Sequence, residues 1–218
     1  MGEESEIWDD LFSKGEFVWR EPHELVIGLL PALEKLDGNR ILDLGCGAGR
    51  HLVFLEGQGF ICHGTDHAQK GLLSARAWLQ EEGFPLRLTQ SEMDQLPYAS
   101  SSFNAVLCLY VIYHGTVEKI ERVLQEIYRL LDPGGLSLVT FISDQHHRYG
   151  CGDEIESGTF ITHIDADAGI PHHFSSEEEV IRMVGDFRVL ELELLERENN
   201  QGLPERHWLV LLEKVREA

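Results

Sequence analysis

Apolar residues along the chain form short runs that alternate with longer amphipathic stretches. The short runs predict five strands, at 40–44, 60–65, 86–89, 103–110 and 136–142. The amphipathic stretches predict helices at 48–58, 68–82 and 117–131. The run at 103–110 is almost wholly apolar, as expected for a strand that is covered on both faces.

Strands that alternate with helices at this spacing predict right-handed βαβ units. Two further apolar runs, at 187–197 and 206–215, follow a helix that Ser175 and Ser176 are expected to open. The expected fold class is therefore α/β, with a doubly wound, seven-stranded and mostly parallel sheet.

We expect a single domain over residues 1–218 with two additions. Residues 1–36 are aromatic and partly helical and form an N-terminal cap, in which Pro31 is expected to kink or end a helix that begins near Pro22. The regular pattern breaks again after the fifth strand. Residues 144–174, rich in Gly, His and Asp, form an insertion that we place on the substrate side of the molecule.

The composition of the chain limits the classes of partner that it is expected to bind. The 218 residues carry a formal charge of −20, which argues against a nucleic-acid surface because phosphate contacts need clustered Lys and Arg. No apolar run has the length of a membrane span, and the acidic N-terminus lacks the pattern of a signal peptide. The four cysteines form no Cys-x-x-Cys pair. We expect a cytoplasmic protein without a nucleic-acid or membrane partner, as a monomer or homodimer.

The candidate chemistry begins where the first strand ends. Asp43 is followed by Gly45, Gly47 and Gly49 at every second position, and a helix is expected directly afterwards. Glycine allows a ligand to approach the backbone closely, and the helix offers free N–H groups. In an open α/β sheet, ligands bind at this edge.

The spacing of the glycines bears on the ligand. A dinucleotide-binding loop would place its third glycine at position 50, which is Arg50 here. Asp43 adds a carboxylate, which suits a ligand with a cationic amino group. Asp66, at the tip of the second strand, is placed to accept the hydroxyls of a ribose; a solvated strand-end carboxylate is the alternative.

These residues carry a family resemblance. The segment 41–49 resembles the first motif of the class I S-adenosylmethionine-dependent methyltransferases, close to the type 11 group. The segments 91–98 with 102–106, and 130–135, resemble two further motifs of the family in the right order. The match covers about residues 38–142, and the last two strands fit the family's final antiparallel hairpin.

The resemblance implies a Rossmann-like methyltransferase fold and S-adenosylmethionine as cofactor, with S-adenosylhomocysteine as product. It also implies which residues hold the cofactor. Asp43 and Gly45 would hold its methionine end, and Asp66 its ribose. Glu92 would meet the adenine amino group, with Asp94 as the alternative if the motif shifts by two residues. The remaining expected cofactor contacts are Cys46, Gly47, Gly49, His67, the Met93 backbone and the Leu109 carbonyl.

The resemblance further implies methyl transfer to a small-molecule acceptor by in-line displacement, for which a general base is often useful. His114, just after the fourth strand, is one candidate; a packing role is the alternative. His172 and His173, at the end of the insertion, are the others, with Pro171 restricting the chain before them. They could instead cap the next helix or face solvent.

Two other features concern metal binding and the aromatic residues near the N-terminus. The histidines of the insertion lack the paired spacing of zinc ligands, so no metal is expected. Trp8, Phe17, Trp19 and Arg20 form either a lid over the cofactor or part of the core.

Two rival functions remain. The first is a methyltransferase-fold protein that binds S-adenosylmethionine for regulation, without turnover. The second is a nicotinamide-dependent oxidoreductase, which the position of Gly49 opposes.

Overall fold

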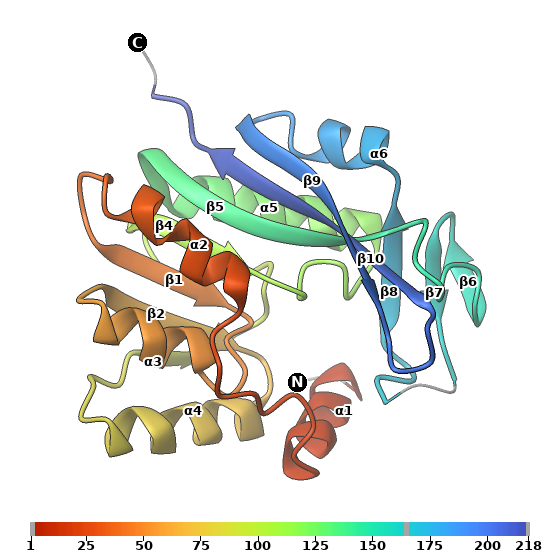
Figure 1. Ribbon diagram of the computed structural model, residues 1–218, viewed down its shortest axis with the longest axis horizontal. Helices are drawn as coiled ribbons and strands as arrows, with labels where there is room; N and C mark the ends of the chain where they lie inside the picture. The colour runs from red at the N-terminus through yellow and green to blue at the C-terminus, as the bar shows by residue number, and fades with distance from the viewer. Residues whose placement is uncertain (1–2, 164–165, 217–218) are drawn as a thin grey trace.

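The computed structural model describes residues 3–163 and 166–216. Its centre is a parallel sheet in the order β3-β2-β1-β4-β5 (Figure 1). The strands are β1 Arg40–Leu44, β2 Ile61–Asp66, β3 Leu88–Gln90, β4 Phe103–Cys108 and β5 Leu131–Ser143. Strand order reverses between β1 and β4, and the loops that leave these two strands diverge. A crevice forms there, as is usual in doubly wound sheets.

The last two strands form the antiparallel hairpin that the predicted fold class includes. β10 (Pro204–Glu213) runs antiparallel to β5, and β9 (Arg188–Glu198) runs antiparallel to β10. The expectation of a mostly parallel α/β sheet with a final antiparallel hairpin is confirmed.

Helices cover both faces of this sheet, because successive residues of each central strand point to opposite sides. The helices are α2 Glu24–Leu33, α3 Arg50–Gly57, α4 Gln69–Glu81, α5 Val117–Leu130 and α6 Glu177–Met183. Val106 and Cys108 pack with α5 and α6, whereas Ala105 and Leu107 pack with α2, α3 and α4. In Figure 1, α5 lies behind β5 and α2 lies in front of the sheet. Two hydrophobic cores therefore hold the sheet rigid.

The number of strands was predicted wrongly. The described residues contain ten strands in one sheet, because the insertion adds β6 Asp153–Glu156, β7 Thr159–Ile161 and β8 Pro171–Ser175. β8 pairs in parallel with Ile142 and Ser143 at the carboxyl end of β5, and β7 pairs antiparallel to β8. The pairing of β5 with β4 ends at Val139, whereas Ile142 pairs with both β10 and β8, so β8 occupies the edge of β5 that β4 has left.

Two local boundaries also differ from the prediction. α2 continues past Pro31 to Leu33. The carbonyl that loses its helical partner belongs to Ile27, on an exposed face of the helix where water can replace the bond. Ser176 alone caps α6, by accepting a hydrogen bond from the Glu179 N–H, while Ser175 ends β8.

The N-terminal cap contains a helix, α1 (Glu3–Ser13), which lies beyond the carboxyl ends of the strands and beside α4 (Figure 1). Ser5 Oγ donates to the His67 carbonyl, and Asp9 Oδ1 accepts from the Lys70 N–H at 2.7 Å. α1 is thereby held against the start of α4. Among the described residues, no helix combines the length and the apolar character that crossing a bilayer requires.

Candidate active site

The glycine loop turns sharply at the carboxyl end of β1. The N–H groups of Gly45 and Cys46 both donate to the Thr65 carbonyl, at 2.8 and 2.9 Å, which fastens the loop to β2. Gly45 has a φ of 74°, and a Cβ there would lie 2.7 Å from Val111 Cγ1 and nearer still to Cγ2. Glycine is required at this position for both its backbone conformation and the close approach of Val111.

A cavity of about 760 Å³ opens above this loop. Its lining includes nine of the ten residues expected to hold the cofactor: Asp43, Gly45, Cys46, Gly47, Asp66, His67, Glu92, Met93 and Leu109. Gly49 is the exception. It has a φ of 88° at the N-cap of α3, and a Cβ there would lie 2.9 Å from Ala75 Cβ, so its glycine serves helix packing.

Three buried oxygen atoms in the cavity wall make no hydrogen bond among the described residues. Asp43 is 3% exposed, and its Oδ2 accepts no hydrogen bond, with His51 Nδ1 3.7 Å away. The same holds for Thr65 Oγ1 and Ser91 Oγ, which also line the cavity. Buried polar atoms of this kind are uncommon unless something else satisfies them. A ligand with an ammonium group and hydroxyl groups, as in S-adenosylmethionine, fits this set.

Asp66 performs two tasks at the end of β2. Its Oδ2 accepts the Gly47 N–H and its Oδ1 accepts the Ala68 N–H, both at 2.8 Å. Burial raises the pKa of the Asp66 carboxyl, and these two N–H groups offset part of that rise. Each oxygen retains a second lone pair, so Asp66 can fix the loop and still accept hydroxyl groups of a ligand.

The two candidate acids for the adenine lie in different surroundings. Glu92 lines the cavity, with its Oε2 3.7 Å from His67 Nδ1. Asp94 turns away and accepts a hydrogen bond from Arg122 Nε of α5 at 2.9 Å. The geometry therefore favours the motif register that assigns Glu92 to the ligand.

We expect Glu92→Gln to weaken binding of S-adenosylhomocysteine about 2- to 12-fold, as for a partly exposed hydrogen bond of about 0.5–1.5 kcal/mol. Asp94→Asn is the matched control and should leave the affinity unchanged, because its carboxylate is engaged with Arg122. Isothermal titration calorimetry measures both values. A larger loss in Asp94→Asn than in Glu92→Gln would reverse the assignment.

Aromatic side chains of the N-terminal cap form one wall of the cavity. Trp8, Phe17 and Trp19 all line it, and Trp8 meets the His114 ring with centroids 5.0 Å apart. Arg20 points elsewhere, stacked over the Trp78 ring of α4. Three of the four residues considered for a lid thus line the cavity.

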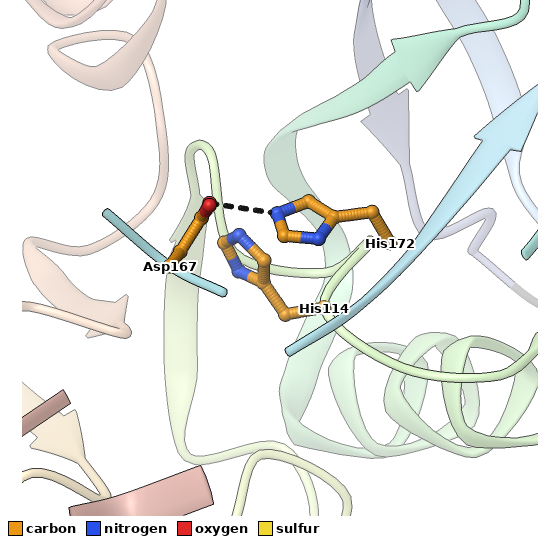
Figure 2. A group of neighbouring side chains, drawn as sticks. All are labelled: His114, Asp167 and His172. Carbon is orange, nitrogen blue, oxygen red and sulfur yellow. Dashed lines mark ion pairs between the residues drawn. The ribbon is translucent and has the colours of Figure 1, made fainter. Parts of the chain in front are cut away.

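The far end of the cavity holds two of the three histidines considered as bases. Figure 2 shows His114 and His172 side by side, with the Asp167 carboxylate facing them. His172 Nε2 lies 2.9 Å from Asp167 Oδ2, and Arg148 donates to both oxygens of the same carboxylate. The insertion therefore contributes His172, Asp167 and Arg148 to one group with His114, which follows β4.

Burial governs the charges in this group. Desolvation lowers the pKa of His114 well below its usual value, so its imidazole is neutral near pH 7. For Asp167, desolvation would raise the pKa, but the contacts with His172 and Arg148 outweigh it and hold the carboxyl ionised. Burial also lowers the pKa of His146 to about 3 and that of His207 to about 4. Three imidazoles at this end of the cavity, those of His114, His146 and His207, are therefore neutral near pH 7.

His173 lies on the opposite side of β8 from His172. Its Nδ1 is 2.8 Å from Thr159 Oγ1, its Nε2 is 3.2 Å from Glu179, and it is 1% exposed. It joins β8 to β7 and α6 and does not line the cavity. We therefore withdraw the expectation that His173 faces the acceptor.

The sequence interpretation missed three residues at this end: Asp167, Arg148 and His207. Asp167 and Arg148 lie in a segment without regular periodicity, so no spacing indicated that they would meet His114. His207 lies on β10, where alternation predicts which residues share a face but not which face meets the cavity.

Tyr110, which has a left-handed backbone conformation, sets the direction of the chain after β4. Leu109 is buried and lines the cavity, and Tyr110 follows with a φ of 60° and its N–H donating to Thr140 Oγ1. The turn brings Val111 onto Gly45 and His114 toward the insertion. Such strain in a residue other than glycine persists where the surrounding structure holds it, often at functional sites.

Comparison with known proteins agrees with this architecture. A family model described as a methyltransferase domain matches residues 41–135. A ubiquinone biosynthesis O-methyltransferase of Rickettsia canadensis is 30% identical over 112 residues, which cover 51% of this chain and 46% of that protein. The chain thus matches about half the length of this curated relative.

Solved structures share the fold over most of the chain. A SAM-dependent methyltransferase from Methanosarcina mazei has a TM-score of 0.75 at 21% identity and covers 90% of this chain and all of its own. A Burkholderia thailandensis 1,6-didemethyltoxoflavin-N1-methyltransferase, with bound 1,6-didemethyltoxoflavin and S-adenosylhomocysteine, has a TM-score of 0.76 at 18% identity. That likeness covers 97% of this chain and 87% of the other.

The sheet order and the glycine loop at the carboxyl end of β1 define a Rossmann-like α/β fold. Residues 41–135 thus match a methyltransferase-domain family model, and solved structures of S-adenosylmethionine-dependent methyltransferases share the fold of the chain.

Proposed function

We propose that this chain transfers a methyl group from S-adenosylmethionine to a small-molecule acceptor. The observation that carries the proposal is the continuous lining of one cavity, from Asp43 and Asp66 at one end to His114 and His172 at the other. A volume of about 760 Å³ is within the range of small-molecule sites. When bound, S-adenosylmethionine supplies a methyl group already activated by its sulfonium, for in-line displacement by the acceptor.

The chain's own residues bind and orient the two reactants. Asp43 is assigned the ammonium group of the cofactor, Asp66 the ribose hydroxyls, and Glu92 with the Met93 backbone the adenine. Trp8 of α1 and the insertion restrict water at the acceptor end. Alignment of the reacting atoms can supply on the order of 7–11 kcal/mol of the barrier, so positioning is the main contribution expected of the protein.

A small acceptor is also consistent with the charge of the chain. The formal charge of −20 opposes binding of nucleic acid. Trp8, Phe17 and Tyr113, together with the neutral imidazoles, offer flat apolar surfaces to an acceptor. An acceptor with a planar ring would contact more of this lining than a flexible polar chain would.

Calorimetry and a product assay test the proposal. We expect S-adenosylhomocysteine to bind with one site per chain and NAD to show no heat of binding. Incubation with S-adenosylmethionine and a panel of aromatic hydroxyl, ring-nitrogen and thiol compounds should release S-adenosylhomocysteine, detected by mass spectrometry. Cofactor binding without product for every acceptor would favour the regulatory alternative, and binding of NAD alone would contradict the assignment.

A further inference from the structure

Three donor atoms at the acceptor end of the cavity come from residues that are distant in sequence. One ligand atom each from His114, Asp167 and His172 lie within 4.8 Å of one another. His114 follows β4, Asp167 lies in the insertion, and His172 belongs to β8. Figure 2 shows both imidazole rings and the carboxylate turned toward a common point.

A hydrogen bond fixes which nitrogen of the His172 ring faces the cavity. His172 Nδ1 lies 2.9 Å from the Ile170 carbonyl, which can only accept, so Nδ1 carries the proton. His172 therefore turns its Nε2 toward Asp167 Oδ2, 2.9 Å away. The His114 backbone N–H donates to the Val111 carbonyl at 3.1 Å, which holds the turn that carries this ring. Histidines that bind metals usually donate their second ring N–H to a carbonyl or carboxylate, which orients the free nitrogen toward the ion.

The contact between His172 and Asp167 is incomplete without a third partner. His172 is 2% exposed, and its Nε2 has no aligned hydrogen-bond partner among the described residues, although Asp167 Oδ2 is 2.9 Å away. Buried polar atoms usually have a partner, and a cation bound by both atoms would supply one.

Arg148 binds the two oxygens of the Asp167 carboxylate unequally. Its Nη2 lies 2.8 Å from Asp167 Oδ1, whereas its Nη1 is 3.3 Å from Oδ2. The shorter bond engages the oxygen that points away from His172. Oδ2 accepts only the longer bond and has a second lone pair that an ion could use. In metal sites a neighbouring group often orients a ligating carboxylate in this way.

We propose that His114, Asp167 and His172 form a binding site for a divalent transition-metal ion at the acceptor end of the cavity. Two imidazoles and one carboxylate are a ligand set used for Zn²⁺ and Fe²⁺, and three protein ligands leave positions open. Adjacent ligands of such an ion are about 3–3.4 Å apart, given bonds of about 2.0–2.2 Å. The His172–Asp167 separation of 2.9 Å is close to this, and His114 needs to approach by about 1.5 Å.

This inference revises the expectation that the chain holds no metal. The sequence argument considered only histidines within the insertion, where ligand spacing is unfavourable. The open positions would face the cavity, where an oxygen of the acceptor could bind. The site itself rests only on the chain's side chains, so it stands or fails independently of the proposed methyl transfer.

The test uses untagged full-length protein that has been dialysed against a chelator. Co²⁺ serves as the probe, because its visible absorption reports coordination, and Zn²⁺ is added as competitor. We expect one Co²⁺ per chain, displaced by Zn²⁺. His114→Gln and Asp167→Asn should each weaken Co²⁺ binding by at least about 10- to 100-fold, since even residues that only orient ligands have effects of this size.

His163→Gln provides the matched control. His163 Nε2 also lies 2.9 Å from a carboxylate oxygen, that of Asp153, but the pair is on the surface, with His163 62% exposed. This variant should bind Co²⁺ as the wild type does. Circular dichroism and thermal melting identify any variant that does not fold, for which His172→Gln is substituted.

Three results would overturn the site: no Co²⁺ absorption, binding unchanged in His114→Gln and Asp167→Asn, or equal weakening in His163→Gln. S-adenosylhomocysteine affinity, measured in the same variants, separates this site from the proposed function. If neither Co²⁺ nor Zn²⁺ binds but His114→Gln abolishes turnover, His114 acts without a metal and the proposal is wrong.

Discussion

Replacing Asp43 with Asn is expected to weaken S-adenosylhomocysteine binding by roughly 30- to 1000-fold. The carboxylate is assigned the ammonium group of the ligand, and loss of a buried charged contact costs about 2–4 kcal/mol. Asn has nearly the same shape, so the effect reports charge. Calorimetry measures the affinity directly.

The same substitution should not lower the stability of the protein without ligand. Asp43 Oδ2 is buried and accepts no hydrogen bond in the described part of the chain, and His51 Nδ1 lies 3.7 Å from it, beyond hydrogen-bond distance. A buried carboxylate with so little compensation is unfavourable. The free energy of unfolding of Asp43→Asn should therefore be unchanged or higher by up to about 2 kcal/mol, measured in urea without ligand. Weaker binding together with equal or greater stability is the signature of a residue kept for its ligand.

Asp132→Asn is the control for this pair of measurements. Asp132 precedes the Pro133-Gly134-Gly135 turn in β5 and binds Asn104 Nδ2 at 2.9 Å, so its charge is already used within the protein. This variant should lose stability and retain full affinity. If Asp43→Asn also kept full affinity, Asp43 would have to be removed from the ligand site.

Gly45→Ala is expected to be the most damaging small substitution in the glycine loop. The backbone has a φ of 74°, which costs a residue with a Cβ about 1–2 kcal/mol. The new Cβ would also overlap the Val111 side chain, and overpacking of this kind costs about 1–3 kcal/mol. We expect a loss of about 2–5 kcal/mol in the free energy of unfolding, with weaker S-adenosylhomocysteine binding because the loop must move.

Gly59→Ala separates the cost of the left-handed backbone from the cost of steric overlap with Val111. Gly59 has a φ of 91°, but nothing lies within 4 Å of the position its Cβ would take. It should therefore show only the backbone cost of about 1–2 kcal/mol. The double variant Gly45→Ala with Val111→Ala should recover part of the loss, as a double-mutant cycle would show. Equal losses in Gly45→Ala and Gly59→Ala would mean that Val111 does not press on the loop.

The sequence alone determined the framework of the cofactor end. Strand β1, the glycines after it, α3 and the acid at the end of β2 follow one another within a single βαβ unit. Alternation and glycine spacing act over a few residues, and parallel strands bring their carboxyl ends to one edge. Asp43 and Asp66 were therefore placed near one another before any tertiary contact was known, whereas Glu92 was named only through the family resemblance; all three line the cavity.

Only the tertiary structure decided the acceptor end. Neighbouring residues of a strand point to opposite faces, so one of His172 and His173 had to face away, but the choice depended on how β8 pairs with β5 and β7. His114, Asp167 and Arg148 meet because two irregular loops end at the same place, and no periodic pattern encodes that meeting. Local sequence preferences determine elements of a few residues. Contacts between distant loops depend instead on the packing of the whole sheet, and that packing brings the acceptor-end residues together.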